Sequence, residues 1–225
     1  MSVAENAKLI RNRIAEACDR AGRNANEVKL IAVTKYVSEQ TTREVLEAGI
    51  RHIGENRLEG FLNKRRKFNE QAIWHFIGTL QSRKVKEVIH DIDYLHSLDR
   101  LSLAKEIEKR ADRRVRCFVQ VNVSGEESKH GVDENEAVSF IEKLADFKSI
   151  EVVGLMTMAP HITDKAAIRS VFRRLRLLAE TVSGKHWAHA PCKELSMGMS
   201  NDYEIAVEEG ATFVRIGTSL VGKEL

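Results

Sequence analysis

The sequence has few of the features that mark specialised classes of protein. Its 225 residues include only two prolines and three cysteines, and aromatic residues make up 6% of the chain. The cysteines, Cys18, Cys117 and Cys192, are odd in number and show no close pairing pattern, which argues against a disulfide framework. No apolar run is long enough to span a bilayer. We therefore expect a cytoplasmic protein without a membrane segment.

The sequence also has no large excess of charge of one sign. The chain has 36 basic and 33 acidic residues, and this balance gives no reason to expect nucleic acid as a partner. The N-terminus lacks the apolar stretch of a signal peptide, and its three acidic residues, Glu5, Glu16 and Asp19, argue against an organellar transit peptide. Apolar residues instead recur at helical spacing up to Gly22, which predicts an N-terminal helix.

Short apolar runs alternate with amphipathic runs along the rest of the chain. The eight runs that we predict as strands are 28–34, 52–55, 73–78, 93–98, 115–123, 150–158, 193–198 and 212–217. Helical patterns lie between them, for example over 41–49, 101–112, 133–147 and 166–184. This alternation predicts an α/β protein of one domain over residues 1–225, a (β/α)8 TIM barrel with the N-terminal helix as an extra element. A doubly wound open sheet fits the same alternation, but the count of eight favours the barrel.

Lys35 follows the first predicted strand, LIAVT, almost at once. A lysine at the end of a strand is most often simply solvated. In a barrel, however, active sites lie at the carboxyl ends of the strands. The predicted fold therefore makes Lys35 a candidate for chemistry.

The last two predicted strands each end in a glycine that a small hydroxyl residue follows, Gly198 before Ser200 and Gly217 before Thr218. Glycine lets the backbone approach a ligand closely. Ser200 stands where we expect a helix N-cap, and exposed N–H groups at a helix start suit a phosphate. Ordinary turns and caps would have the same sequence, but barrels frequently bind phosphate after strands seven and eight.

Arg215 lies two residues before Gly217, so both face the same side of the last predicted strand. An arginine that points into a barrel is costly unless it is paired or bound to a ligand, and a buried ion pair is the alternative. A lysine amine forms a Schiff base with an aldehyde. Pyridoxal phosphate carries an aldehyde, a phosphate and a ring nitrogen, which match Lys35, the two hydroxyl loops and Arg215.

Six motifs in order carry a resemblance to a known family: AVTK (32–35), GENR (54–57), WHFIGTLQSRK (74–84), GLMTM (154–158), LSMGMSND (195–202) and VRIGTSLVG (214–222). With these the chain resembles the YggS/PROSC family of pyridoxal-phosphate homeostasis proteins, which are similar to the barrel domain of alanine racemase. Two departures are Thr79, where the family more usually has histidine, and the variable region 185–194.

The resemblance implies eight cofactor-binding residues: Lys35 as the Schiff-base lysine, Asn56 and Ile77 along the ring, Met199, Ser200, Gly217 and Thr218 around the phosphate, and Arg215 at the pyridine nitrogen.

Two other patterns are weaker. His186, His189 and Cys192 have a spacing that could bind zinc, but no fourth ligand is near, so we expect no metal site. The basic run NKRRKF (63–68) could contact nucleic acid, and we interpret it instead as the solvated face of a helix.

The resemblance favours a carrier or buffer of pyridoxal phosphate over an enzyme. We expect a monomer that exchanges the cofactor with apo-enzymes or free amino acids. A pyridoxal-phosphate-dependent racemase is the alternative, and Arg215 does not decide, because alanine racemase also has arginine at the ring nitrogen. Racemisation needs acid–base groups on both faces of the substrate. In alanine racemase one comes from a second domain, which this sequence does not show after the last strand, so we expect no catalytic residues and no turnover.

Overall fold

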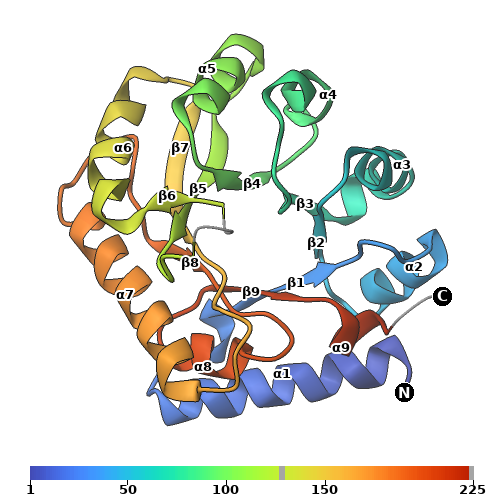
Figure 1. The fold of residues 1–225 in the computed structure, drawn as a ribbon. Helices are drawn as coiled ribbons and strands as arrows, with labels where there is room; N and C mark the ends of the chain where they lie inside the picture. The colour runs from blue at the N-terminus through green and yellow to red at the C-terminus, as the bar shows by residue number, and fades with distance from the viewer. Residues whose placement is uncertain (127–129, 223–225) are drawn as a thin grey trace.

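The computed structural model describes residues 1–126 and 130–222. Within these residues, eight parallel strands form a closed barrel surrounded by helices (Figure 1). In the order in which they pair, the barrel strands are β1 (Lys29–Val33), β2 (His52–Glu55), β3 (Ile73–Phe76), β4 (Tyr94–Leu98), β5 (Val115–Asn122), β7 (Ile150–Met156), β8 (Glu194–Ser196) and β9 (Phe213–Ile216). The barrel closes because β9 pairs with β1, and the short β6 (Val132–Asp133) pairs with β5 outside it. The predicted (β/α)8 barrel is confirmed.

Each barrel strand is followed by a helix. The helices are α1 (Val3–Arg20), α2 (Glu39–Glu47), α3 (Leu58–Phe68), α4 (Val85–Val88), α5 (Leu101–Arg110), α6 (Ala137–Lys143), α7 (Lys165–Ser183), α8 (Tyr203–Glu208) and α9 (Thr218–Val221). Single turns of 3-10 helix are η1 (Ala25–Glu27), η2 (Asn69–Gln71), η3 (Ser82–Lys84), η4 (Glu134–Glu136) and η5 (Leu144–Asp146). Among the described helices, none is long and apolar enough to cross a bilayer.

Helix α1 is the predicted extra element ahead of the first strand. It begins with a capping box, in which the Ser2 hydroxyl accepts from the Glu5 N–H and the Glu5 carboxylate accepts from the Ser2 N–H. Gly22 follows its end with a φ of 64°, which glycine adopts without strain. The buried face of α1 packs against α8 and α9 (Figure 1). Its members recur at helical spacing: Val3, Ala7, Ile10, Ile14, Ala17 and Cys18.

The four predicted helical ranges each differ from the observed ones by one or two residues at an end, and two of them differ in a further way. The helix predicted over 41–49 begins at Glu39, because the Ser38 hydroxyl accepts a hydrogen bond from the Thr41 N–H at 3.2 Å and caps the helix earlier. The helix predicted over 133–147 is divided into η4, α6 and η5. A period of apolar residues indicates a helical segment but does not distinguish a continuous α-helix from one with 3-10 turns at both ends.

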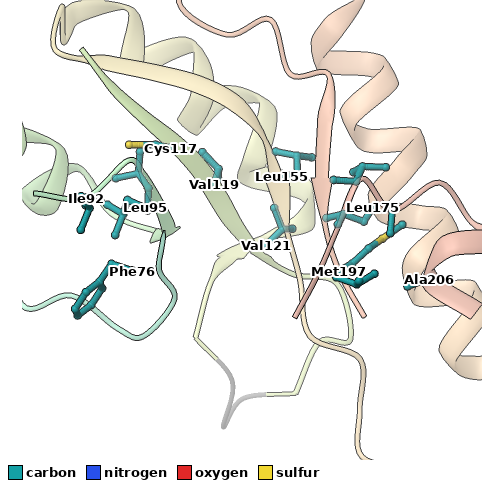
Figure 2. Packing of buried hydrophobic residues seen from close by; sticks show 14 of the residues in the cluster. Phe76, Ile92, Leu95, Cys117, Val119, Val121, Leu155, Leu175, Met197 and Ala206 are labelled. Atoms are coloured by element: carbon teal, nitrogen blue, oxygen red, sulfur yellow. The ribbon is translucent and has the colours of Figure 1, made fainter. Parts of the chain in front are cut away.

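The hydrophobic core has two layers because side chains of a strand alternate between faces. Cys117, Val119 and Val121 of β5 point outward to the helices, and Leu155 of β7 and Leu175 of α7 lie in the same layer (Figure 2).

The second layer fills the barrel interior. It includes Phe118 of β5 and Phe213 of β9, whose rings meet edge to face with centroids 5.4 Å apart. The three cysteines are buried and unpaired.

Candidate functional site

Lys35 lies just beyond the end of β1, on a turn at the carboxyl end of the barrel. The Val37 N–H donates to the Thr34 carbonyl at 3.3 Å and closes this turn, and Tyr36 has a φ of 63°. The Lys35 side chain is exposed and lines a cavity of about 360 Å³, together with Asn56. The structure therefore places the predicted Schiff-base lysine at an open cavity and not in the core.

Beneath this turn lies a buried ion pair that sequence reasoning missed. Lys64 of α3 is only 5% exposed, and its Nζ lies 2.7 Å from Glu55 Oε1 and 2.5 Å from the carbonyl oxygen of Thr34. The interpretation of 63–68 as a solvated face is therefore wrong for Lys64. The available signal was Glu55, an acidic residue next to the apolar end of a predicted strand, which needs a cationic partner when it is buried.

Asn56 and Ile77 follow β2 and β3 at the same end of the barrel. The Ile77 N–H donates to the Glu55 carbonyl at 2.8 Å, and the Ile77 side chain packs over Gly54. The Asn56 Oδ1 is buried and accepts no hydrogen bond from any described residue. A buried acceptor without a donor is costly. A ligand that brings a hydroxyl or N–H to this position would satisfy it.

Arg215 points into the barrel from β9 and is 4% exposed. Its guanidinium donates to the Ser196 hydroxyl at 2.5 Å and to the Thr157 carbonyl at 2.9 Å. It forms no salt bridge with a carboxylate of the described residues, so the alternative of a buried ion pair is wrong. Burial lowers the pKa of Arg215 to about 10, which leaves it charged at neutral pH. Since a guanidinium has five N–H groups, it can still donate to a ligand.

Three histidines extend this polar contact across the barrel. His96 Nδ1 lies 2.8 Å from the Ser196 hydroxyl, His96 Nε2 lies 2.9 Å from His75 Nδ1, and His75 Nε2 lies 2.9 Å from His52 Nδ1. We call His52, His75, His96, Ser196 and Arg215 the barrel chain. Burial lowers the pKa of His52 to about 4 and holds the pKa values of His75 and His96 well below 6.5. All three rings are therefore neutral at pH 7.

The loop after β8 differs from its prediction. Helix α8 begins at Tyr203, so Ser200 is not its N-cap but lies in the preceding turn. The reason is Asp202, whose Oδ1 accepts from the Met199 N–H at 2.6 Å and holds that turn closed. Gly198 has a φ of 90°, and a Cβ there would lie 2.6 Å from the Cβ of Ala206 in α8. Glycine is therefore required here by both conformation and space.

The loop after β9 adjoins the two neighbouring loops. The Arg215 N–H donates to the Gly198 carbonyl at 2.9 Å, which joins the strand β9 to the loop after β8. Gly217 lies beside β1, since a Cβ there would be 3.6 Å from Val33. Thr218 is exposed and is the first residue of α9. The predicted phosphate glycine therefore lies next to the strand that leads to Lys35.

The structure does not gather all eight predicted residues around one cavity. Ser200 lines a second cavity of about 300 Å³ between α1, α7 and α8, whereas Lys35 and Asn56 line the first. Met199 is 38% exposed at the rim. For a cofactor of the predicted kind, the fit rests on two features: the Asn56 acceptor without a donor and the donors that remain on Arg215.

The zinc candidates do not come together. His189 Nε2 lies 2.9 Å from the Ile141 carbonyl, and Cys192 is buried. In the parts of the chain that the structure covers, no group of three or more His, Cys, Asp or Glu side chains is placed to hold a metal ion.

The barrel, the lysine after β1 and the arginine on β9 together place the protein in a class of alanine-racemase-like barrels. Residues 6–224 match the sequence model of the family described as alanine racemase, N-terminal domain, and the chain belongs to that family. Within it, the chain is 40% identical to a protein of Aquifex aeolicus over 227 residues, which cover 99% of each chain. That relative is named pyridoxal phosphate homeostasis protein. The resemblance drawn from the six motifs is confirmed.

Solved structures agree with this assignment. A protein from Bifidobacterium adolescentis has a TM-score of 0.92 and 34% identity, covering 97% of this chain and 94% of that one. PipY of Synechococcus elongatus, in a structure with PLP bound, has a TM-score of 0.80 and 31% identity, covering 93% of this chain and all of PipY.

Proposed function

We propose that this protein binds pyridoxal 5′-phosphate and acts in pyridoxal-phosphate homeostasis, as a carrier or buffer of the cofactor. The observation that carries the proposal is Arg215, a buried cation whose protein partners are both neutral. Support comes from the relative named for pyridoxal phosphate homeostasis and from PipY with PLP bound. The residues that would hold the cofactor are Lys35, Asn56, Ile77, Met199, Ser200, Arg215, Gly217 and Thr218.

The proposed cofactor-binding residues would contact different parts of the cofactor. The cofactor supplies an aldehyde, which condenses with a lysine amine and releases water. Lys35 offers that amine from an exposed turn. Ser200 and Thr218 offer hydroxyl donors to phosphate oxygens, while Arg215 donates to the ring nitrogen. Because a guanidinium cannot accept a proton, the ring nitrogen stays unprotonated and withdraws electrons weakly.

We propose further that the protein works without turnover, as a cytoplasmic monomer of one domain. Lys35 can act as a base on one face of a bound amino acid, whereas racemisation needs groups on both faces. The unprotonated ring nitrogen, which withdraws electrons weakly, also disfavours turnover. The exposed position of Lys35 favours exchange of the cofactor with apo-enzymes and free amino acids. The buried, unpaired cysteines fit a reducing compartment.

Borohydride trapping tests the binding site. We expect purified protein mixed with pyridoxal phosphate to absorb visible light, and reduction should fix the cofactor to the peptide that contains Lys35. Lys35→Ala should abolish the adduct. Lys84→Ala, a change at another partly exposed lysine, should leave it intact. An adduct mapped to Lys84 would show that the site is wrong.

Turnover is tested separately, in deuterated water with L-alanine and other L-amino acids. We expect no sustained formation of D-isomer, and at most slow incorporation of α-deuterium without inversion. Chiral chromatography follows the first and mass spectrometry the second. D-isomer formed over many turnovers, and lost in Lys35→Ala, would replace the carrier proposal by a racemase.

A further inference from the structure

Thr34, the residue before Lys35, has all of its polar groups bound by β2 and α3. Its N–H donates to the Gly54 carbonyl at 3.1 Å, and its hydroxyl donates to Glu55 Oε1 at 2.6 Å. Its carbonyl accepts from Lys64 Nζ at 2.5 Å. Thr34 is fully buried, and Glu55 and Lys64 are 1% and 5% exposed. The residue that leads into Lys35 is therefore held at three points.

The carbonyl of Thr34 and the amide nitrogen of Lys35 belong to the same planar peptide group. Lys64 therefore fixes the plane from which the Lys35 side chain leaves the backbone. The same carbonyl accepts from the Val37 N–H and closes the turn. Tyr36, at the third position of that turn, has a φ of 63°, a left-handed conformation that is strained in a residue other than glycine. A strained turn stays closed only when its surroundings hold it.

Stability alone does not explain a buried ion pair at this position, because well-packed apolar side chains serve as well or better in protein interiors. The helix also leaves room for the pair. Gly60 lies in the first turn of α3, and a Cβ there would lie 3.1 Å from Glu55 Oε2. The sequence thus keeps space beside the Glu55 carboxylate.

We propose that Glu55 and Lys64 are positioning residues for Lys35. They hold the Thr34–Lys35 peptide and the turn so that the amine is presented to an aldehyde ligand in one orientation. This inference rests on the proposed function, because it concerns how Lys35 reaches its ligand. It assigns no contact between the pair and the cofactor.

The test uses the double variant Glu55→Gln/Lys64→Met. It removes both charges together, so no unpaired charge is left in the core, and the glutamine side chain can still accept from the Thr34 hydroxyl. We expect the rate of borohydride-trappable adduct formation with pyridoxal phosphate to fall by about tenfold or more, the effect of one lost orienting hydrogen bond to a charged group. Affinity for 4′-deoxypyridoxine 5′-phosphate should change less than about twofold, because this ligand has no aldehyde and its binding does not depend on the orientation of the Lys35 amine.

A third measurement, on the ligand-free protein, accompanies this comparison of the two ligands. The Val37 N–H should exchange with deuterium faster in the double variant, because the Thr34 carbonyl that accepts from it is no longer held by Lys64. The matched control is Lys67→Met, which removes an exposed lysine of α3 whose partner is Glu39. It should change none of the three measurements.

Two results would overturn the inference. One is equal weakening of both ligands by the double variant, which indicates a general disturbance of the site. The other is unchanged adduct formation and Val37 exchange. Absence of any adduct in the wild-type protein is a different outcome, because it rejects the proposed function itself.

Discussion

Arg215 donates a hydrogen bond to the Ser196 hydroxyl at 2.5 Å, at one end of the hydrogen-bonded barrel chain. A guanidinium can only donate, so the Ser196 oxygen accepts and its own proton can go to His96 Nδ1. In that arrangement His96 donates from Nε2 to His75, and His75 donates from Nε2 to His52. We predict that the barrel chain has this one direction, from Arg215 to His52.

This direction predicts the tautomer of each ring. His52, His75 and His96 should all be neutral at pH 7 and should carry their proton on Nε2. Nitrogen-15 NMR of the ligand-free protein distinguishes the two ring nitrogens and checks the assignment. A proton on Nδ1 of His75 or His96 would show that the hydrogen bonds of the barrel chain run in the opposite direction.

The barrel chain also predicts loss of stability in acid. The folded pKa of His52 is about 4, and those of His75 and His96 are lower than usual, whereas the unfolded values are about 6.5. As pH falls below 6.5, the unfolded chain takes up protons that the folded protein does not. The stability present above pH 6.5 should therefore decrease by on the order of 2 kcal/mol or more between pH 7 and pH 4.

Urea unfolding at a series of pH values measures this decrease. His90 is exposed beside Asp112, so His90→Asn should leave the pH dependence in place. A free energy of unfolding that stays constant from pH 7 to pH 4 contradicts the prediction.

The two hydroxyl loops predict a difference between phosphorylated and unphosphorylated ligands. Ser200→Ala/Thr218→Ala removes the two hydroxyls that we propose as donors to the phosphate dianion, each worth roughly 1.5–3 kcal/mol. Pyridoxal phosphate should therefore bind much more weakly to the double variant, while pyridoxal, without the phosphate, should bind almost as before. Fluorescence titration with both ligands makes the comparison. Equal weakening of the two would place the hydroxyls away from the phosphate.

Gly198 should be far less tolerant of a side chain than Gly22. Both have positive φ, but a Cβ at Gly22 meets nothing within 4 Å, whereas at Gly198 it would overlap Ala206 and Tyr203 of α8. Gly22→Ala should cost about 1 kcal/mol for conformation alone. Gly198→Ala should cost about 1–3 kcal/mol more, from overpacking. Thermal and urea unfolding of the two variants measure the difference, and equal costs would mean that α8 moves aside freely.

The strands of the barrel were predictable because each is a short apolar run bounded by polar residues, and all eight lie inside the predicted ranges. Lys35 and Arg215 were recognisable as site candidates once the barrel fixed which strand ends meet. Lys64 was not, because its partner Glu55 comes from another element and only the folded chain joins them. The start of α8 was missed for a similar reason, since Ser200 and Asp202 are both good capping residues and the contact with Met199 decides between them.

The barrel chain also helps Arg215 to remain a cation without a salt bridge, in addition to the nearby Asp202 carboxylate, which raises the pKa of Arg215. In the predicted direction, each hydroxyl or imidazole of the barrel chain has its acceptor atom toward Arg215 and its N–H or O–H away from it, so the dipoles of the four neutral groups add. The guanidinium therefore faces the negative end of an aligned row of dipoles, which stabilises its charge without cancelling it. A carboxylate bound directly to the guanidinium would neutralise the arginine, whereas a row of dipoles leaves its positive charge available to an anionic ligand.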